Sequence, residues 1–156
     1  MNGRPVRESI SEYSELALPN DANGLGNLLG GKIMHLVDLA GAIAAMKHCR
    51  NPVVTASVDH MAFIHPVRIG QLVRLRASVN RAFNTSMEVG VKVWVEDLIL
   101  GEEKHVSSAY LTFVAVTREG KSVPVPPVIP ETDEEKRRYE RAGTRRDYRL
   151  SQRRGK

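Results

Sequence analysis

A long apolar segment is the feature of this sequence that most limits how the chain can fold. Between Lys32 and His48, apolar side chains recur at the spacing of an α-helix but cover more than one face of it. They are Ile33, Met34, Leu36, Val37, Ala40, Ile43, Ala44 and Met46. A helix that is apolar nearly all round is a buried helix, and Asn51-Pro52 ends this one. The rest of the chain must therefore supply the elements that cover it.

Five shorter segments carry the pattern of β-strands. The clearest is Ser86–Glu96, in which every second position from Met87 onward is Met or Val. The other candidates are Ser14–Leu18, Val53–Phe63, Leu72–Phe83 and Ser107–Thr117. Period-two alternation is typical of half-buried antiparallel strands, so the sequence predicts an α+β fold. The simplest arrangement curls a sheet of about five strands around the helix. The other sheet face and the open side of the helix would then need a partner subunit.

The C-terminal part of the chain has a different composition. Val123–Pro130 contains four prolines and should run extended over the surface, because proline cannot donate to a central sheet ladder. Thr132 and Glu135 match a capping box, which predicts a short helix that starts near Asp133 and frays past Gly143. We therefore expect one domain over residues 1–130 and a C-terminal helix with a basic tail over 131–156.

The net charge of +5 is unevenly distributed. Residues 136–156 hold ten Lys or Arg and two acids, a net charge of +8, whereas residues 1–135 carry −3. A basic tail can bind nucleic acid, a membrane or a phosphorylated ligand, or it can be a solvated terminus whose deletion (143–156) barely alters function. The chain has neither the aromatic platform of single-strand binders nor a helix-turn-helix pattern, so we expect no nucleic-acid partner.

Cysteine content and hydropathy limit the compartment. Cys49 is the one cysteine, which excludes an internal disulfide and a cysteine-based zinc site. The longest apolar segment, Ile33–Met46, is too short to span a bilayer, and the first residues show no secretory signal. We therefore expect a cytoplasmic protein without membrane insertion.

Asp38 does not fit its surroundings, because it lies inside the apolar helix. Burying a lone carboxylate is unfavourable. Asp38 therefore either faces solvent at a helix edge, pairs with His35 one turn earlier, or has a functional role. Neither this pair nor His60 with His65 has a third ligand at a suitable spacing, so we expect no metal site.

A glycine-rich loop, Asn23–Gly31, leads into the same helix. Free N–H groups at a helix start can receive negative charge, and Gly30 and Gly31 allow a ligand to approach the backbone. The alternative is a tight turn that needs small residues. The sequence supports neither a P-loop nor a dinucleotide fold, since Gly-Lys-Ser/Thr and a surrounding βαβ unit are missing. With Asp38 two turns further on, the loop could polarise a carbonyl beside a bound water, which is acyl-transfer or hydrolytic chemistry.

These segments resemble hotdog-fold acyl-CoA thioesterases, and more narrowly the bacterial acyl-CoA hydrolases related to the brain acyl-CoA hydrolase. The resemblance covers roughly residues 10–142 and rests on Pro19–Asp38, Val53–Asp59, Thr85–Val89, Thr112–Val116, Pro124–Pro126 and Glu134–Tyr139. It implies a hotdog fold, in which a curved antiparallel sheet wraps a long central helix. It also implies dimers in which two sheets join edge to edge, often assembled further as hexamers, with each active site at a subunit interface.

The resemblance also implies the roles of individual residues. Asn23 of one protomer and Asp38 of its neighbour would form the catalytic site, with Asp38 as general base and the Gly30 and Gly31 N–H groups as the oxyanion site. Coenzyme A contacts would come from Thr55, Ser57, Arg81, Thr85, Ser86, Arg137 and Arg138. Coenzyme A would be part of substrate and product, with no separate cofactor. For the two tail arginines, an exposed helix face that pairs with neighbouring acids is an equal alternative.

We therefore expect an acyl-CoA thioesterase that acts on fatty acyl-CoA. The alternative is a hotdog module that binds acyl-CoA as a regulator without hydrolysing it. Two positions depart from the family pattern. Leu29 replaces an aromatic residue or His before the glycine pair, which could widen the acyl pocket. Phe83-Asn84 replaces a turn glycine, and Phe83 could cover the ligand.

Overall fold

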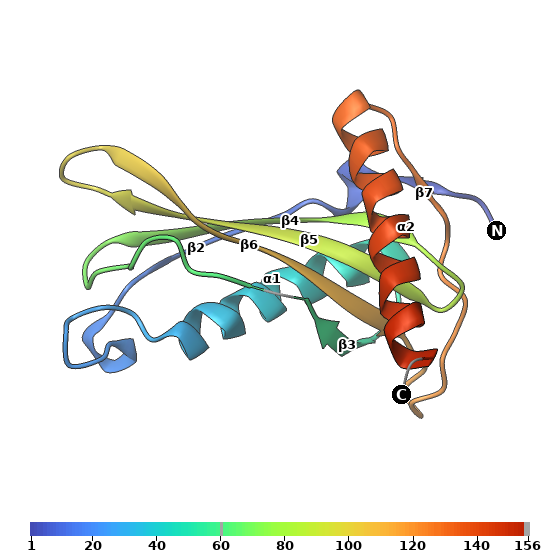
Figure 1. Ribbon diagram of the computed structural model, residues 1–156, viewed down its shortest axis with the longest axis horizontal. Helices are drawn as coiled ribbons and strands as arrows, with labels where there is room; N and C mark the ends of the chain where they lie inside the picture. The colour runs from blue at the N-terminus through green and yellow to red at the C-terminus, as the bar shows by residue number, and fades with distance from the viewer. Residues whose placement is uncertain (60, 155–156) are drawn as a thin grey trace.

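The computed structural model describes residues 1–59 and 61–154, and its central feature is one long helix against one curved sheet (Figure 1). The elements in chain order are β1 (Arg4–Pro5), η1 (Val6–Ser9), β2 (Ser11–Leu16), η2 (Pro19–Asp21), α1 (Gly30–Cys49), β3 (Val53–Val58), β4 (Leu72–Ala82), β5 (Ser86–Asp97), β6 (Glu102–Ala115), β7 (Val128–Ile129) and α2 (Asp133–Arg154). The predicted α+β hotdog architecture is confirmed, with a five-stranded antiparallel sheet in the order β2-β4-β5-β6-β3.

Helix α1 forms where the apolar periodicity predicts it, and it starts two residues earlier, at Gly30. Ile33, Leu36, Val37, Ala40 and Ala44 are buried against the sheet. Arg50 ends the helix in the left-handed conformation, with φ of 57°. The helix is not buried all round, because Met34, Leu39 and Met46 are each more than 40% exposed. The predicted open side is therefore present in the single chain.

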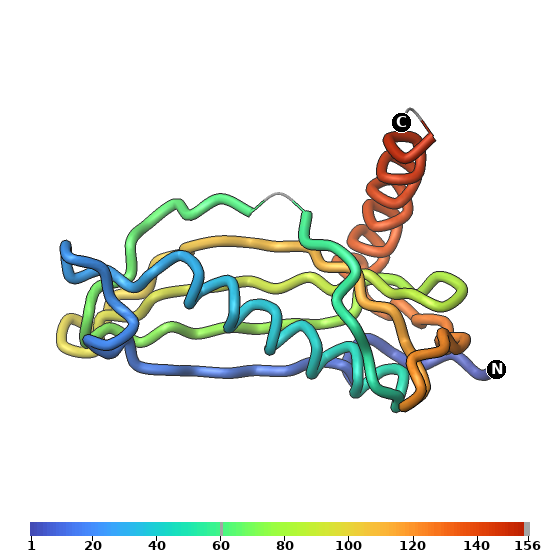
Figure 2. The backbone as a smooth tube through the Cα atoms, turned by 90° about the horizontal axis from the view of Figure 1, so that it is seen from below, coloured from blue at the N-terminus to red at the C-terminus, as the bar shows by residue number. Residues whose placement is uncertain are grey.

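The alternation in the strands places one set of side chains toward α1. The five alternate Met and Val residues of β5 are at most 4% exposed, and β4 and β6 bury their alternate residues in the same way. This inner face and α1 make one continuous core. Figure 2 shows the strands side by side behind the helix, with β2 and β3 as the two edges of the sheet.

Several strand boundaries differ from the prediction. Strand β2 begins at Ser11 and pairs with β4 from there on, because Ser11 continues the same ladder. Strand β3 ends at Val58, short of Phe63, and His60 lies outside the described residues. Strand β6 begins at Glu102, since it pairs with β5 up to the four-residue turn that Gly101 closes with φ of 71°. Because the hairpin turn is tight, strand pairing continues beyond the alternating apolar residues from which the strand was predicted.

The C-terminal prediction was wrong in the length of the helix and incomplete in the proline-rich segment. Helix α2 has 22 residues and continues through Gly143 to Arg154. Its tertiary contacts with the outer face of the sheet stabilise it where its sequence alone predicted fraying. The proline-rich segment buries Val125 and Val128, and β7 pairs with β1 in a small parallel sheet.

The two long helices lie on opposite faces of the sheet. Glu88, Gly90 and Lys92 alternate with the core residues of β5, so they belong to the outer face, and α2 covers that face near Glu88. Helix α2 crosses the strands at the end remote from the β5–β6 hairpin (Figure 1). Within the described residues, no helix is long and apolar enough to cross a membrane.

Candidate functional site

Asp38 and Thr55 form a contact between α1 and the edge strand β3. The Thr55 hydroxyl donates a hydrogen bond of 2.7 Å to Asp38 Oδ1. Asp38 is half-buried and Thr55 is exposed, so the pair lies at the open side of the helix. Asp38 therefore pairs with Thr55 and not with His35. Nothing in the described part of the chain donates a hydrogen bond to Asp38 Oδ2, which leaves that oxygen open to accept a proton.

Asn23 organises the loop that precedes α1. Its Oδ1 accepts hydrogen bonds from the backbone N–H groups of Leu25 (2.9 Å) and Asn27 (3.2 Å), and its own backbone N–H donates to the carbonyl of Asn27. Gly26 makes the turn with φ of 79°. The exposed Asn23 side chain therefore uses its oxygen to shape the loop. Its amide nitrogen has no partner among residues 1–59 and 61–154 and can donate outward.

The first residues of α1 present unpaired backbone donors. The N-cap residue Leu29 makes no side-chain cap, and its carbonyl accepts from the N–H groups of Lys32 and Ile33. In the described chain, the N–H groups of Gly30 and Gly31 have no acceptor. A Cβ at Gly31 would meet nothing within 4 Å, whereas at Gly30 it would lie 3.3 Å from the Phe63 ring. A ligand can therefore reach the helix start on the Gly31 side.

Asp38 lies seven residues beyond Gly31, on the same face of α1. At the helical rise, seven residues separate the two positions by about 10 Å. A general base and an oxyanion donor that act on one carbonyl each lie about 3 Å from the reacting atoms. By this backbone spacing, Gly31 and Asp38 of one chain lie farther apart than two groups that contact the same reacting atoms.

The surface around Asp38 is apolar and uncovered. On β3, Val58 is 43% exposed on the face toward α1, and Val54, on the opposite face, is 51% exposed. Met34 and Leu39 of α1 are exposed as well. Strand β3 also ends the sheet, so one side of its backbone has no neighbouring strand within the described chain. An exposed apolar face beside an open strand edge is typical of a surface that another chain covers.

A second cluster lies at the turn between β4 and β5. It consists of Arg81, Phe83, Ser86 and Arg146. The guanidinium groups of Arg81 and Arg146 lie 5.7 Å and 4.3 Å from the Phe83 ring centre. Arg146 also donates to the Ser86 hydroxyl at 3.3 Å. Neither arginine pairs with a carboxylate of the described residues. The sequence predicted Arg81 and Ser86 here but missed Arg146, whose only signal was the general basicity of the tail.

The other predicted coenzyme A contacts are scattered. Ser57 follows a register shift in β3, and the Thr85 carbonyl accepts from the backbone of Ala115. Arg137 and Arg138 both pair with Glu134, the latter at 3.2 Å, and hydrogen bonding to Arg137 lowers the pKa of Glu134 below its usual value. The structure thus shows the paired helix face that was the alternative for these two arginines.

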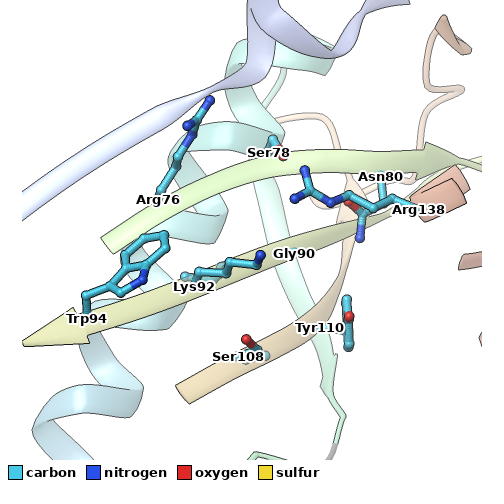
Figure 3. Close-up of a pocket in the computed structure, with 11 residues that line it drawn as sticks. Arg76, Ser78, Asn80, Gly90, Lys92, Trp94, Ser108, Tyr110 and Arg138 are labelled. Atoms are coloured by element: carbon cyan, nitrogen blue, oxygen red, sulfur yellow. The ribbon is translucent and has the colours of Figure 1, made fainter. Parts of the chain in front are cut away.

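The outer face of the sheet carries a groove of about 310 Å³ (Figure 3). It lies over β4, β5 and β6, and Arg138 of α2 closes one end. Its polar lining includes Arg76, Lys92 and Trp94. The groove is on the opposite side of the sheet from α1, so it takes in none of the predicted catalytic residues. No cluster of three potential metal ligands occurs in the described residues.

Comparison with known proteins gives consistent matches. The family model for the thioesterase superfamily matches residues 25–102. An uncharacterized acyl-CoA thioester hydrolase of Bacillus subtilis is 42% identical over 132 residues, which are 85% of this chain and 77% of that protein. Mouse acyl-coenzyme A thioesterase 11 is also 42% identical, over 139 residues and 89% of this chain. The chain spans only 23% of that mouse protein and 38% of the human cytosolic acyl coenzyme A thioester hydrolase.

Solved structures agree with these matches. An apo-hexameric acyl-CoA thioesterase superimposes with a TM-score of 0.94 at 40% identity, covering 97% of each chain. An acyl-CoA hydrolase of Staphylococcus aureus, solved with butyryl coenzyme A and coenzyme A, has a TM-score of 0.88 at 37% identity, covering 96% of this chain and 92% of that one.

The Staphylococcus aureus hydrolase has also been solved as alanine variants of one asparagine, one aspartate and one threonine. In its own numbering, the asparagine lies 15 residues before the aspartate and the threonine 17 residues after it. Asn23, Asp38 and Thr55 have the same spacing in this chain.

Proposed function

This chain belongs to the thioesterase superfamily, as an acyl-CoA hydrolase with the hotdog fold, and we propose that it hydrolyses fatty acyl-CoA with a water that Asp38 activates at a site shared by two subunits. The observation that carries the proposal is the Thr55–Asp38 hydrogen bond at the uncovered side of α1. It orients a carboxylate with one free oxygen beside a strand edge that a second copy can cover. The matching spacing in the Staphylococcus aureus enzyme supports the same three residues.

The chemistry follows from these positions. Asp38 Oδ2 accepts a proton from the attacking water while the water oxygen bonds to the thioester carbon. The carbonyl oxygen becomes an oxyanion, which the N–H groups of Gly30 and Gly31 stabilise. As the oxyanion collapses, the C–S bond breaks and the free acid forms. The proton that Asp38 took from the water passes to the departing coenzyme A thiolate, which restores the Asp38 carboxylate. Because a thiolate is a good leaving group, the reaction needs no strong general acid.

The separation of Gly31 from Asp38 along α1 favours a site shared by two subunits. With about 10 Å between the two backbone positions on one helix, the oxyanion site of one chain would act with Asp38 of another. Two copies joined through β3 would cover Val54 and Val58 and continue the sheet across a two-fold axis. Asn23 would enter the same site from the chain that supplies Gly30 and Gly31. The hexameric thioesterase with a TM-score of 0.94 supports a dimer assembled further as a hexamer.

Coenzyme A would lie along the edge of β3 and end at the β4–β5 turn. Thr55 and Ser57 lie at the strand edge that would face the pantetheine arm. Arg81 and Arg146, which have no carboxylate partner in the described chain, would pair with phosphate oxygens beside Ser86 and Thr85. Arg137 and Arg138 are weaker candidates, because Glu134 already pairs with both. We propose no cofactor apart from the coenzyme A of the substrate, and a cytoplasmic location like that of the human cytosolic relative.

A non-hydrolytic acyl-CoA binder is the alternative function, and thiol release separates the two. The purified protein would be incubated with short, medium and long acyl-CoA, and free thiol would be measured continuously with a disulfide reagent. We expect steady thiol release that continues over many turnovers and depends on chain length. Stoichiometric binding without thiol release at any chain length would contradict the proposed activity and support the regulator.

A further inference from the structure

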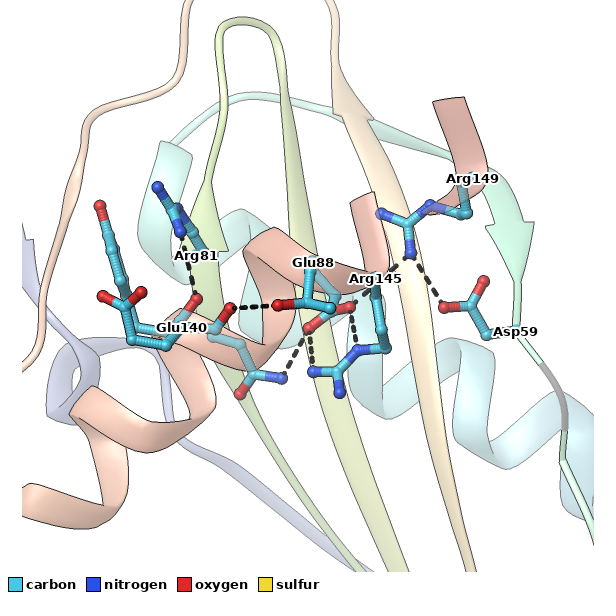
Figure 4. Close-up of polar contacts among 9 residues, drawn as sticks. Asp59, Arg81, Glu88, Glu140, Arg145 and Arg149 are labelled. Atoms are coloured by element: carbon cyan, nitrogen blue, oxygen red, sulfur yellow. Dashed lines mark hydrogen bonds and ion pairs between the residues drawn. The ribbon is translucent and has the colours of Figure 1, made fainter. Parts of the chain in front are cut away.

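A buried ion pair holds α2 on the outer face of the sheet. The Glu88 side chain of β5 is fully buried, and Arg145 binds its two oxygens with Nε at 2.7 Å and Nη2 at 2.9 Å (Figure 4). Asn80 Nδ2 donates to the same carboxylate at 3.0 Å. A bidentate pair with a further donor fixes both partners, because removing either leaves a buried charge unpaired. Arg145 is therefore a fixed point of α2.

A second arginine, one helical turn further along α2, reaches the end of the edge strand. Arg149 Nη1 donates to Asp59 Oδ2 at 2.9 Å and lies 3.8 Å from Glu88 (Figure 4). Between these contacts, the Arg145 guanidinium lies 3.7 Å from the Tyr110 ring centre. Glu88, Tyr110 and Asp59 belong to β5, β6 and the residue after β3, so two arginines span three neighbouring strands.

Of these three strands, β3 most needs a contact from outside the sheet to fix its position. It has six residues, pairs with β6 alone among the described strands, and shifts register between Thr55 and Ser57. Beyond its last residue, the Asp59 backbone N–H donates to the carbonyl of Tyr110, and the Asp59 side chain binds Arg149. Thr55, four residues before Asp59, carries the hydroxyl that donates to Asp38.

We infer that Arg149 is a positioning residue for hydrolysis: by holding Asp59 against α2, it sets the position of β3 and thereby the Thr55 hydroxyl on Asp38. The inference rests on the proposed function, because it assigns Asp38 the general-base role. Arg149 itself touches no reacting atom. Helix α2 then has a role in turnover besides covering the sheet.

A double-mutant cycle with Thr55 tests this inference. In the wild-type background, we expect Arg149→Met to lower kcat about tenfold for the preferred acyl-CoA, with KM changed less than about threefold. In the Thr55→Val background, where no hydroxyl remains to position, the same substitution should lower kcat less than about twofold. A general loss of folding or binding would lower kcat by the same factor in both backgrounds.

Two further variants control for stability and charge. Arg153→Met removes an exposed arginine one turn further along α2 and should leave kcat unchanged. Asp59→Ala removes the acceptor of Arg149 while Arg145 and Glu88 stay paired. It therefore remains informative if Arg149→Met unfolds, and it should give the same result in the cycle. Unchanged kcat in both the Arg149 and the Asp59 variants would overturn the inference. A loss of kcat that is equal in the wild-type and Thr55→Val backgrounds would overturn it as well. Absence of thiol release by the wild-type protein would instead contradict the proposed function.

Discussion

At the scale of single residues, the proposed site depends on the hydrogen bond between Thr55 of β3 and Asp38 of α1. Asp38 was detectable in the sequence because a carboxylate is unusual in an apolar helix. The roles of Thr55 and Arg146 were not, because their partners are distant in the sequence and depend on how β3 and α2 pack. Thr55 was expected to contact coenzyme A alone, and the structure adds its hydrogen bond to Asp38.

The Thr55 hydroxyl can be tested by an isosteric change. Thr55→Val keeps the β-branched shape that suits a strand but removes the donor to Asp38. Hydrogen bonds to charged groups contribute about 1.5–3 kcal/mol, so we expect kcat to fall about tenfold or more. Thr55→Ser keeps the hydroxyl and should retain most of the activity. Steady-state thiol release measures both variants, and equal kcat for Val and Ser would show that the hydrogen bond does not contribute.

At the scale of elements, periodic patterns were sufficient to locate α1 and the three long strands β4, β5 and β6, because those elements bury one continuous face. Helix α2 was predicted too short. Ala142 is its one buried residue in the described chain, so its sequence has little apolar pattern, and the contacts that extend it are ion pairs with Glu88 and Asp59. Such pairing between distant residues cannot be read from local spacing.

Truncation tests whether the tail is part of the fold. A merely solvated tail predicts that deletion of residues 143–156 barely alters hydrolysis. The structure instead predicts a loss of stability, since the deletion removes Arg145 and Arg149 together with the part of α2 that covers Glu88. Breaking a buried pair costs about 3–5 kcal/mol of unfolding free energy. Denaturant unfolding should show this loss, whereas deletion of residues 151–156 should not. Glu88→Gln in the chain that lacks residues 143–156 should recover part of the loss, because it removes the unpaired charge. Failure to recover it would contradict the role of the ion pair.

His48 gives the fold a specific pH dependence. It is fully buried at the end of α1, 2.6 Å from the Pro126 carbonyl, and burial lowers its pKa below the usual 6.5. Below about pH 6.5, the unfolded ring takes up a proton that the folded ring does not, so unfolding free energy decreases as pH falls toward the lowered pKa. The slope contributed is at most ~1.4 kcal/mol per pH unit.

The His48→Gln variant removes this titration and can still donate to the Pro126 carbonyl. We expect its unfolding free energy to fall less steeply than that of the wild type between about pH 7 and pH 5. Denaturant titrations at a series of pH values provide the comparison. Parallel pH profiles for the two proteins would show that His48 does not carry a lowered pKa.

At the scale of the whole molecule, the apolar pattern predicted a sheet curled around one helix with an open side, because one helix and one sheet cannot bury each other fully. The family resemblance implied the hotdog fold. The sequence could not place the site within one chain, and the structure explains why. Asn23, Gly30 and Gly31 lie before and at the start of α1, whereas Asp38 lies two turns along it beside the edge strand. In the proposed mechanism, a complete site would combine the loop of one copy with the Asp38 of another.

Mixing two inactive variants tests this shared site most directly. Asn23→Ala and Asp38→Asn dimers should each lose most activity, because every site lacks one of its two contributions. After denaturation together and refolding, about half the dimers should be mixed, and each mixed dimer contains one intact site. We predict recovery to about a quarter of the wild-type kcat per chain. Mixed dimers that are shown by mass spectrometry to form but remain inactive would contradict a site shared between subunits.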